Sequence, residues 1–282
     1  MTRAVPFMPE SERWLCSLRL EGRSASTLDC YSRDLRDVSA AIGGATLGAL
    51  ISFDQATLDR TNERWSSSGV AASTIYRRFS ALRSFARHLA QRGIRGSVAL
   101  LALKYPQCTR SKRPALNLEE VGFVVRAPLL SDDWTAARDD AAFSVQANSG
   151  LTPAETVALN VRDVKPCSIH VTATTFRPRI VGVEQPSTSL IERYLAAVPF
   201  RLPASGPLFV NRCGRRLSER TLQLSFWRRK MEYGLVGPCG PSSLRRRHAE
   251  LLVADGSSPE ALAVALGLHV SSVFRFFEGA RR

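Results

Sequence analysis

Apolar residues recur every three or four positions through the first hundred residues, which predicts a bundle of amphipathic helices over 7–98. We expect helices over residues 7–20, from 24–27 to 43–44, within 54–65 and over 73–93. The last segment has the strongest pattern, because its apolar residues share one helical face: Ile75, Phe79, Leu82, Ala86 and Leu89.

The periodic pattern stops at residues 104–116, KYPQCTRSKRPAL, which contain two prolines and several basic residues. Such a segment is typical of an interdomain linker. We therefore expect a domain over residues 1–103, a linker over 104–116 and a second domain over 117–282.

The second half begins with two helix-start signals. Residues 117–120 resemble a capping box, and residues 131–133 are expected to cap a helix that runs to Asn148. Two β-prone pieces follow at 169–172 and 179–183, which predicts a hairpin.

Further helical patterns complete this half, over residues 187–197, 220–233 and 241–256, with another beginning at Ser258. The predicted fold is thus mainly α with a small β-sheet.

Composition indicates an ordinary globular protein, with 44% hydrophobic and 23% charged residues in a chain of 282. No apolar run reaches the roughly 18 residues of a membrane span, so we expect a cytoplasmic protein that is not in the membrane. The six cysteines form no C-x-x-C pair, and no phosphate-binding loop or dinucleotide fingerprint occurs. We expect no metal and no cofactor.

Charge changes this picture. The net charge is +14, and only four of the 39 basic residues are lysines. The excess is uneven, at +5 over residues 1–100, +1 over 101–200 and +8 over 201–282. Arginine suits phosphates and guanine edges, so the two basic blocks favour double-stranded DNA as the partner.

The stretch around Pro241, Leu244 and Arg245 resembles tyrosine recombinases of the phage integrase family, with the motif P-H-x-L-R-H, then L-G-H and a helix bearing the nucleophilic tyrosine. Residues 149–159, SGLTPAETVAL, are similar to the same family's T-G-L-R-x-x-E-L-L-A-L. The sequences around residues 24–35 and 73–85 are similar to that family's N-terminal domain. The resemblance implies a SAM-like core-binding domain of four or five helices, followed by a catalytic-fold domain, together clamping DNA.

The catalytic positions of that family are mostly changed here. Five positions differ from the family's arginine, lysine, histidine, histidine or tryptophan, and tyrosine: Thr152, Phe176, Ser242, Leu268 and Phe276. Phe277 is the other register for the tyrosine, and Arg245 is retained. Arg177 and His269 lie close to lost groups, while His88, His170 and His248 are isolated. We therefore expect a catalytically inactive protein.

The expected function is sequence-specific DNA binding in a regulatory or accessory role, on a mobile element and associated with the nucleoid. Two alternatives stay open, a non-catalytic subunit that pairs with itself or with an active recombinase, and an enzyme with an atypical active site. The residues expected to contact DNA are Arg77, Arg78, Arg83, Arg87, Arg177, Arg228, Arg229, Arg245, Arg246 and Arg247.

Overall fold

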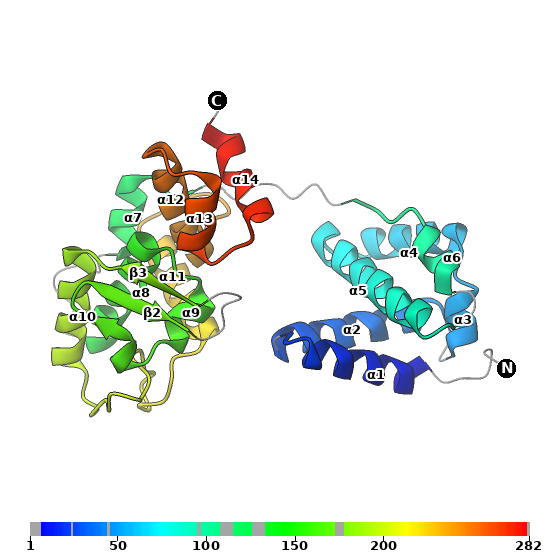
Figure 1. The fold of residues 1–282 in the computed structure, drawn as a ribbon, viewed down its shortest axis with the longest axis horizontal. Helices are drawn as coiled ribbons and strands as arrows, with labels where there is room; N and C mark the ends of the chain where they lie inside the picture. The colour runs from blue at the N-terminus through cyan, green and yellow to red at the C-terminus, as the bar shows by residue number, and fades with distance from the viewer. Residues whose placement is uncertain are drawn as a thin grey trace. The chain divides into compact units, whose positions relative to one another are not determined.

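The computed structural model describes residues 7–23, 25–43, 46–94, 97–107, 115–125, 133–172 and 178–280. The chain divides into two compact units, residues 1–111 and 112–282. Each unit has its own apolar core. Figure 1 shows the helices and strands of both units.

The first unit is a bundle of helices, α1 (Phe7–Leu20), α2 (Ala25–Ala41), α3 (Leu47–Ile51), α4 (Gln55–Ser67), α5 (Ala72–Gln91) and α6 (Ser97–Ala102). The four predicted helices are confirmed as α1, α2, α4 and α5. Asp54 caps α4 by accepting a hydrogen bond from the Thr57 amide at 2.8 Å. The short helices α3 and α6 are not predicted by the sequence pattern.

Aromatic rings fill the core between α1, α2 and α5. The rings of Trp14 and Tyr31 stack with centroids 5.4 Å apart, and Trp14 also packs on Phe85 at 5.5 Å. The apolar stripe predicted for α5 is buried, with Phe79 and Leu82 among its members. This packing fixes which face of α5 remains at the surface, and several arginines lie on that face.

The second unit combines helices with a small sheet (Figure 1). Its elements are α7 (Leu118–Val125), α8 (Trp134–Ser149), α9 (Pro153–Ala158), η2 (Val161–Asp163), β1 (Val164–Lys165), β2 (Ser168–Val171), β3 (Arg179–Gly182), α10 (Gln185–Ala197), α11 (Glu219–Glu232), α12 (Pro241–Ala254), α13 (Pro259–Leu266) and α14 (Val270–Ala280). The predicted hairpin is confirmed as β2 and β3, which pair antiparallel with Ile169 opposite Val181. The sheet order is β1-β2-β3.

Helix α8 lies in the middle of this unit, and most of its residues are buried. Asp133 caps it by accepting from the Thr135 amide at 2.9 Å, and Gly150 ends it at φ +62°. The capping box at the start of α7 is also confirmed, because Asn117 and Glu120 each bond the other's backbone amide, at 2.8 and 2.7 Å.

The last three helices form a second, smaller core in this unit. Ala249 of α12 packs there with Leu262 and Leu266 of α13 and with Val273 and Phe276 of α14. No single helix in the described parts of the chain is long and apolar enough to span a membrane. Residues Pro259–Leu266 and Val270–Phe277 are long and apolar enough only when taken together, and the chain bends by 111° between them.

Candidate functional site

Thr152 is the N-cap residue of α9 and forms a capping box with Glu155. The Thr152 hydroxyl accepts a hydrogen bond from the Glu155 amide at 3.1 Å, and the Glu155 carboxylate accepts one from the Thr152 amide at 2.8 Å. A threonine therefore caps a helix where the resemblance places the family's first catalytic arginine. Its short side chain carries no charge for a phosphate.

Two buried arginines converge on the same carboxylate. Arg179 of β3 donates to Glu155 Oε1 at 2.6 Å and to Oε2 at 3.2 Å, and Arg245 of α12 donates to Oε2 at 3.1 Å. The exposed fractions of the three side chains are 4% for Arg179, 4% for Glu155 and 11% for Arg245. Breaking such a buried network leaves unpaired charge in a low dielectric.

The remaining donors of both arginines bond to backbone carbonyls. Arg179 Nε donates to the Ala265 carbonyl at 2.9 Å. Arg245 donates to the carbonyls of Gly150 at 2.9 Å and Leu266 at 2.6 Å. The network therefore joins β3, α12 and the start of α9 to the end of α13. Arg245, retained from the family motif, is directed into the protein by these bonds.

Burial and charge set the ionisation of this cluster. Burial alone raises the pKa of Glu155, but the hydrogen bonds from Arg179 and Thr152 and the charges of both arginines bring that pKa below its usual value. Burial lowers the pKa of Arg245 to about 10, against the opposing effect of Glu155. At neutral pH one carboxylate thus faces two guanidinium ions.

His248 lies beside the arginines, although the sequence pattern indicates an isolated residue. Its ring is packed on Gly150, where an added Cβ would come 2.5 Å from Cδ2 of the imidazole. Burial, and then the charges of Arg245 and Arg179, lower the pKa of His248, so a neutral imidazole is expected at neutral pH. No local signal in the sequence places this histidine or Arg179 at the cluster.

The other positions of the family motif lie on the last helices. Ser242 is exposed on the first turn of α12, and Leu268 is half-buried after α13. Phe276 is 6% exposed in the α12–α14 core, with the Arg275 guanidinium 4.9 Å from its ring centroid. Phe277 packs against the same core.

His269 is exposed and bonded to Ser271 Oγ at 2.9 Å. Phe176 and Arg177 lie outside the described residues, so their predicted roles stay predictions.

The arginines predicted on α5 lie at or near the surface of the first unit. Arg77 is 43% exposed and lies 3.0 Å from the buried Asp34 carboxylate. Arg78 lies over the Trp65 ring, with 4.6 Å between its guanidinium carbon and the ring centroid, and Arg83 lies over Tyr105 at 4.2 Å. Arg87 is exposed. The contacts with Asp34, Trp65 and Tyr105 position the guanidinium groups of three arginines along α5: Arg77, Arg78 and Arg83.

The arginines predicted in the second unit separate into two groups. Arg228 is exposed and Arg246 is half-buried against Glu250 at 2.8 Å, with Arg247 half-buried beside it. Arg229 is instead 7% exposed, lies 2.7 Å from Asp140 and donates to the Val124 and Ala136 carbonyls. Its donors are bonded inside the unit, and its predicted contact with DNA stays a prediction.

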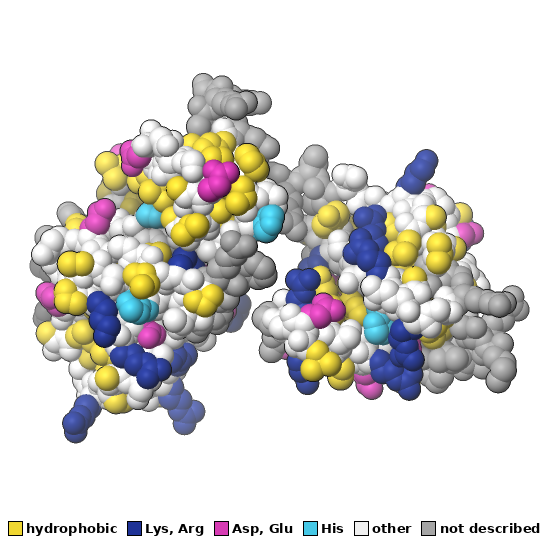
Figure 2. Space-filling model, in the orientation of Figure 1, with side chains coloured by type: hydrophobic (Ala, Val, Ile, Leu, Met, Phe, Trp, Pro, Cys, Tyr) yellow, Lys and Arg dark blue, Asp and Glu magenta, His cyan; other side chains and the backbone are white. Residues whose placement is uncertain are grey.

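Charged and hydrophobic side chains are distributed unevenly on the surface that Figure 2 shows. Lys and Arg side chains are visible on both units, while hydrophobic side chains gather over the α12–α14 end of the second unit. Among the residues that the structure describes, no group of three or more His, Cys, Asp or Glu side chains could hold a metal ion.

Known proteins resemble this chain over almost its whole length. Residues 127–274 match the phage integrase family, and residues 12–93 match the N-terminal SAM-like domain of phage integrases. A tyrosine recombinase XerC from Nitrobacter winogradskyi is 30% identical over 95% of this chain and 88% of that protein. One from Methylobacterium nodulans is 31% identical, with the same coverage of both chains.

Similarity to solved structures supports the fold alone, since sequence identity is low. A lambda integrase dimer bound to a COC′ core site superimposes with a TM-score of 0.74 at 15% identity, covering 96% of this chain and 95% of that one. The predicted arrangement, a SAM-like core-binding domain followed by an integrase catalytic-fold domain, is confirmed by these matches.

Proposed function

The chain belongs to the phage integrase family of tyrosine recombinases, and on that premise we propose that it binds duplex DNA in site-specific recombination without cleaving DNA itself. The relatives named above are recombinases, which favours a non-catalytic subunit of a recombination complex over a purely regulatory protein. The net charge of +14 supports binding to a polyanion.

Two phenylalanines carry the proposal that cleavage is lost. The family resemblance places the nucleophilic tyrosine at Phe276 or Phe277, and the chain has no tyrosine after Tyr233. A phenyl ring has no oxygen with which to attack phosphorus. The packing of Phe276 among apolar residues of α12–α14 gives its ring a structural role instead.

The surrounding groups add to this argument. Stabilising the charge that develops on a phosphate needs preorganised donors, and the loss of one typically lowers the rate about 10²- to 10³-fold. Both terminal nitrogens of Arg245 already donate to groups inside the unit, namely Glu155 and the carbonyls of Gly150 and Leu266. Thr152 and Ser242 offer only neutral hydroxyl groups.

DNA binding is tested first, by measuring the affinity for a labelled duplex between about 50 and 200 mM salt. Contacts with several phosphates make log K fall with log salt at a slope of about −0.9 per contact. A slope near zero would contradict the proposed DNA binding.

Cleavage is tested on duplexes that the protein recovers from total genomic DNA, each carrying a nick that traps a 3′-phosphotyrosyl adduct. We expect no covalent adduct from the wild type or from Phe276→Tyr, because the second variant restores a hydroxyl group but none of the missing donors. An adduct with wild-type protein would overturn the proposed loss of catalysis. An adduct with Phe276→Tyr alone would show that the remaining donors suffice.

A recombinase with an atypical active site is the second candidate. It is favoured by the similarity to tyrosine recombinases over 95% of the chain and by the neutral imidazole expected for His248 beside Arg245. The same nicked duplexes distinguish the two, since only this candidate forms an adduct with the wild-type protein. Its loss in a His248→Ala variant would then assign the reaction to this cluster.

A further inference from the structure

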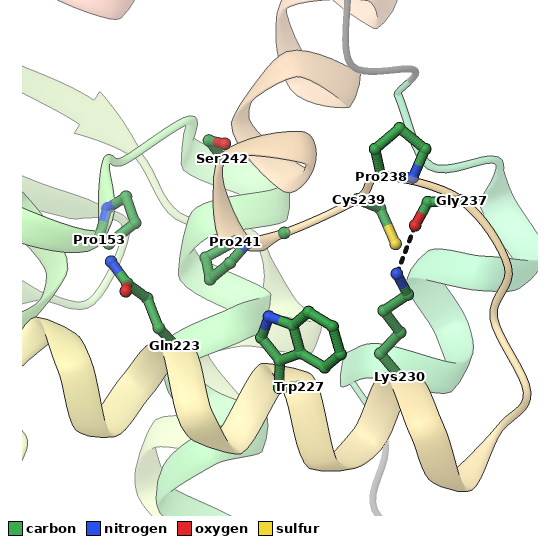
Figure 3. A pocket seen from close by; sticks show the side chains of 10 residues that line it. Pro153, Gln223, Trp227, Lys230, Gly237, Pro238, Cys239, Pro241 and Ser242 are labelled. Atoms are coloured by element: carbon green, nitrogen blue, oxygen red, sulfur yellow. Dashed lines mark hydrogen bonds between the residues drawn. The ribbon is translucent and has the colours of Figure 1, made fainter. Parts of the chain in front are cut away.

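A cavity of about 810 Å³ lies between α11, the start of α12 and the start of α9. Figure 3 shows Trp227 and Lys230 projecting into it from α11, with Pro241 and Ser242 on the first turn of α12. Gln223, also from α11, and Pro153 at the start of α9 line it as well. The volume lies within the range of about 300–1,000 Å³ that small-molecule pockets occupy, so the cavity is large enough for a nucleotide.

Trp227 gives the cavity an aromatic surface. Trp227 is 54% exposed, although it is a large apolar residue within α11. Any nucleobase can stack on such a face, because every base has a π-surface. Pro153 and Pro241 add apolar walls on which a planar ring can pack.

The polar groups of the cavity suit the rest of a nucleotide. The Lys230 ammonium group lies 5.1 Å from the Trp227 ring centroid and donates a hydrogen bond to the Gly237 carbonyl. The Lys230 residue is only 9% exposed, but its ammonium group is a compact cation beside the aromatic face, where its charge attracts a phosphate that enters the cavity. The Gln223 amide and the Ser242 hydroxyl supply donors and acceptors for a base edge. An apolar peptide segment would leave these groups without partners.

We propose that this cavity binds an unpaired nucleotide of the DNA, with its base stacked on Trp227 and its phosphate near Lys230. This inference rests on the proposed function, since it needs the protein to bind DNA. A base inside a duplex stacks on its neighbours and cannot present its face to a side chain. The ligand must therefore be extrahelical, and a base that is already unpaired costs least to place there.

The test compares three labelled duplexes that share one sequence, at one salt concentration. The first is fully paired, the second has a single extrahelical thymidine, and the third has an extrahelical abasic site at the same position. We expect wild-type protein to prefer the thymidine bulge over both others by about tenfold, within the effect that base-stacking aromatics have on alanine substitution. The abasic duplex bends like the thymidine bulge but offers no base.

Variants assign that preference to the cavity. Trp227→Ala is expected to abolish it and to leave binding of the paired duplex unchanged, while Trp227→Phe keeps most of it. Met231→Ala is the matched control, because Met231 is 68% exposed on α11 and is not among the residues that line the cavity. It should bind all three duplexes like the wild type.

The other outcomes contradict either the nucleotide site or the proposed DNA binding. Equal affinity of the wild type for all three duplexes, or a preference that survives in Trp227→Ala, would exclude the nucleotide site. A preference shared by the abasic duplex would show that the protein selects bendable DNA. Failure to bind even the paired duplex would contradict the proposed function rather than the cavity assignment.

Discussion

The two units of this protein use arginine in opposite ways. On α5 of the first unit, Arg77 and Arg87 are exposed, and 43% of the Arg77 side-chain surface is accessible to solvent. In the second unit four arginines are buried and bonded to carboxylates or carbonyls: Arg138, Arg179, Arg229 and Arg245. The formal charge of a segment therefore overstates the charge that it offers to a partner.

The exposure of the paired guanidinium differs between the units. In the second unit, Glu155 and Asp140 are buried together with the arginines beside them, which neutralises charge inside the unit. In the first unit, Asp34 is also buried, but its partner Arg77 is 43% exposed, and the partner of Arg78, Asp37, is itself 47% exposed. Exposed pairs contribute little stability, whereas buried pairs are costly to break. Mutations should therefore affect folding in the second unit and DNA binding in the first.

Removing Glu155 should have the largest effect. Glu155→Ala leaves Arg179 and Arg245 buried without their shared anion, and we expect the unfolding free energy of the second unit to fall by about 3–5 kcal/mol. Urea unfolding followed by circular dichroism measures it. Glu250→Ala, which removes the i,i+4 partner of Arg246, is the control and should cost about 0.5 kcal/mol or less. Equal effects would contradict the proposed difference between buried and partly exposed ion pairs.

Two glycines with similar backbone angles provide the next contrast. Gly150 in the second unit has φ +62° and Gly93 in the first has φ +70°, so alanine at either costs about 1–2 kcal/mol for the left-handed conformation. Only at Gly150 would the new Cβ lie 2.5 Å from the His248 ring.

Crowding against His248 adds about 1–3 kcal/mol to the cost of Gly150→Ala. Thermal and urea unfolding of both variants should show this difference. If Gly93→Ala proved as destabilising as Gly150→Ala, the packing of His248 on Gly150 would be wrong.

Lowering the pH should reduce the unfolding free energy of the second unit, because Glu155 becomes protonated. The pKa of Glu155 in the folded protein lies below its unfolded value of about 4.3, so the unfolded state binds more protons between the two values. This contribution to stability is complete above pH 4.3 and is lost as the pH falls through the folded pKa. Urea unfolding between about pH 6 and pH 3 measures the decline. Glu155→Gln should show a shallower decline, and an unchanged slope would exclude Glu155 as its source.

Arg87 should show the smallest effect on folding. Arg87→Ala removes an exposed side chain, so the unfolding free energy should change by no more than about 0.5 kcal/mol. If Arg87 contacts a DNA phosphate, the variant should bind all duplexes more weakly and reduce the salt slope by about one. Arg229→Ala should show the reverse pattern, with a large loss of stability. Unchanged DNA affinity of Arg87→Ala would remove Arg87 from the interface.

The helices were predictable where their signals are local. The cap at Asp133, the capping box at Asn117 and the apolar stripe of α5 all lie within a few residues of the element that they define. Helices α3 and α6 are only five and six residues long, which is too short for a periodic pattern. Thr152 and Glu155 have the spacing of a capping box, which is a further local signal for the start of α9.

The candidate site was less predictable, because its contacts join residues far apart in the sequence. Leu222, Ser225, Phe226 and Arg229 follow the i, i+3, i+4, i+7 pattern of a buried face, so the pattern contains a signal that Arg229 is buried. Its partner Asp140 lies 89 positions earlier, beyond any local signal. The same holds for Arg179 and Glu155, which are 24 positions apart.

The small core of α12–α14 also bears on how such a protein could evolve. A phenylalanine at position 276 keeps that core apolar, while a change at Glu155 would strand two charges inside the fold. Under the proposed function, the substitution that removes the reaction and the substitutions that unfold the protein fall at different positions. One mutational step could then remove catalysis while purifying selection still maintains a folded protein.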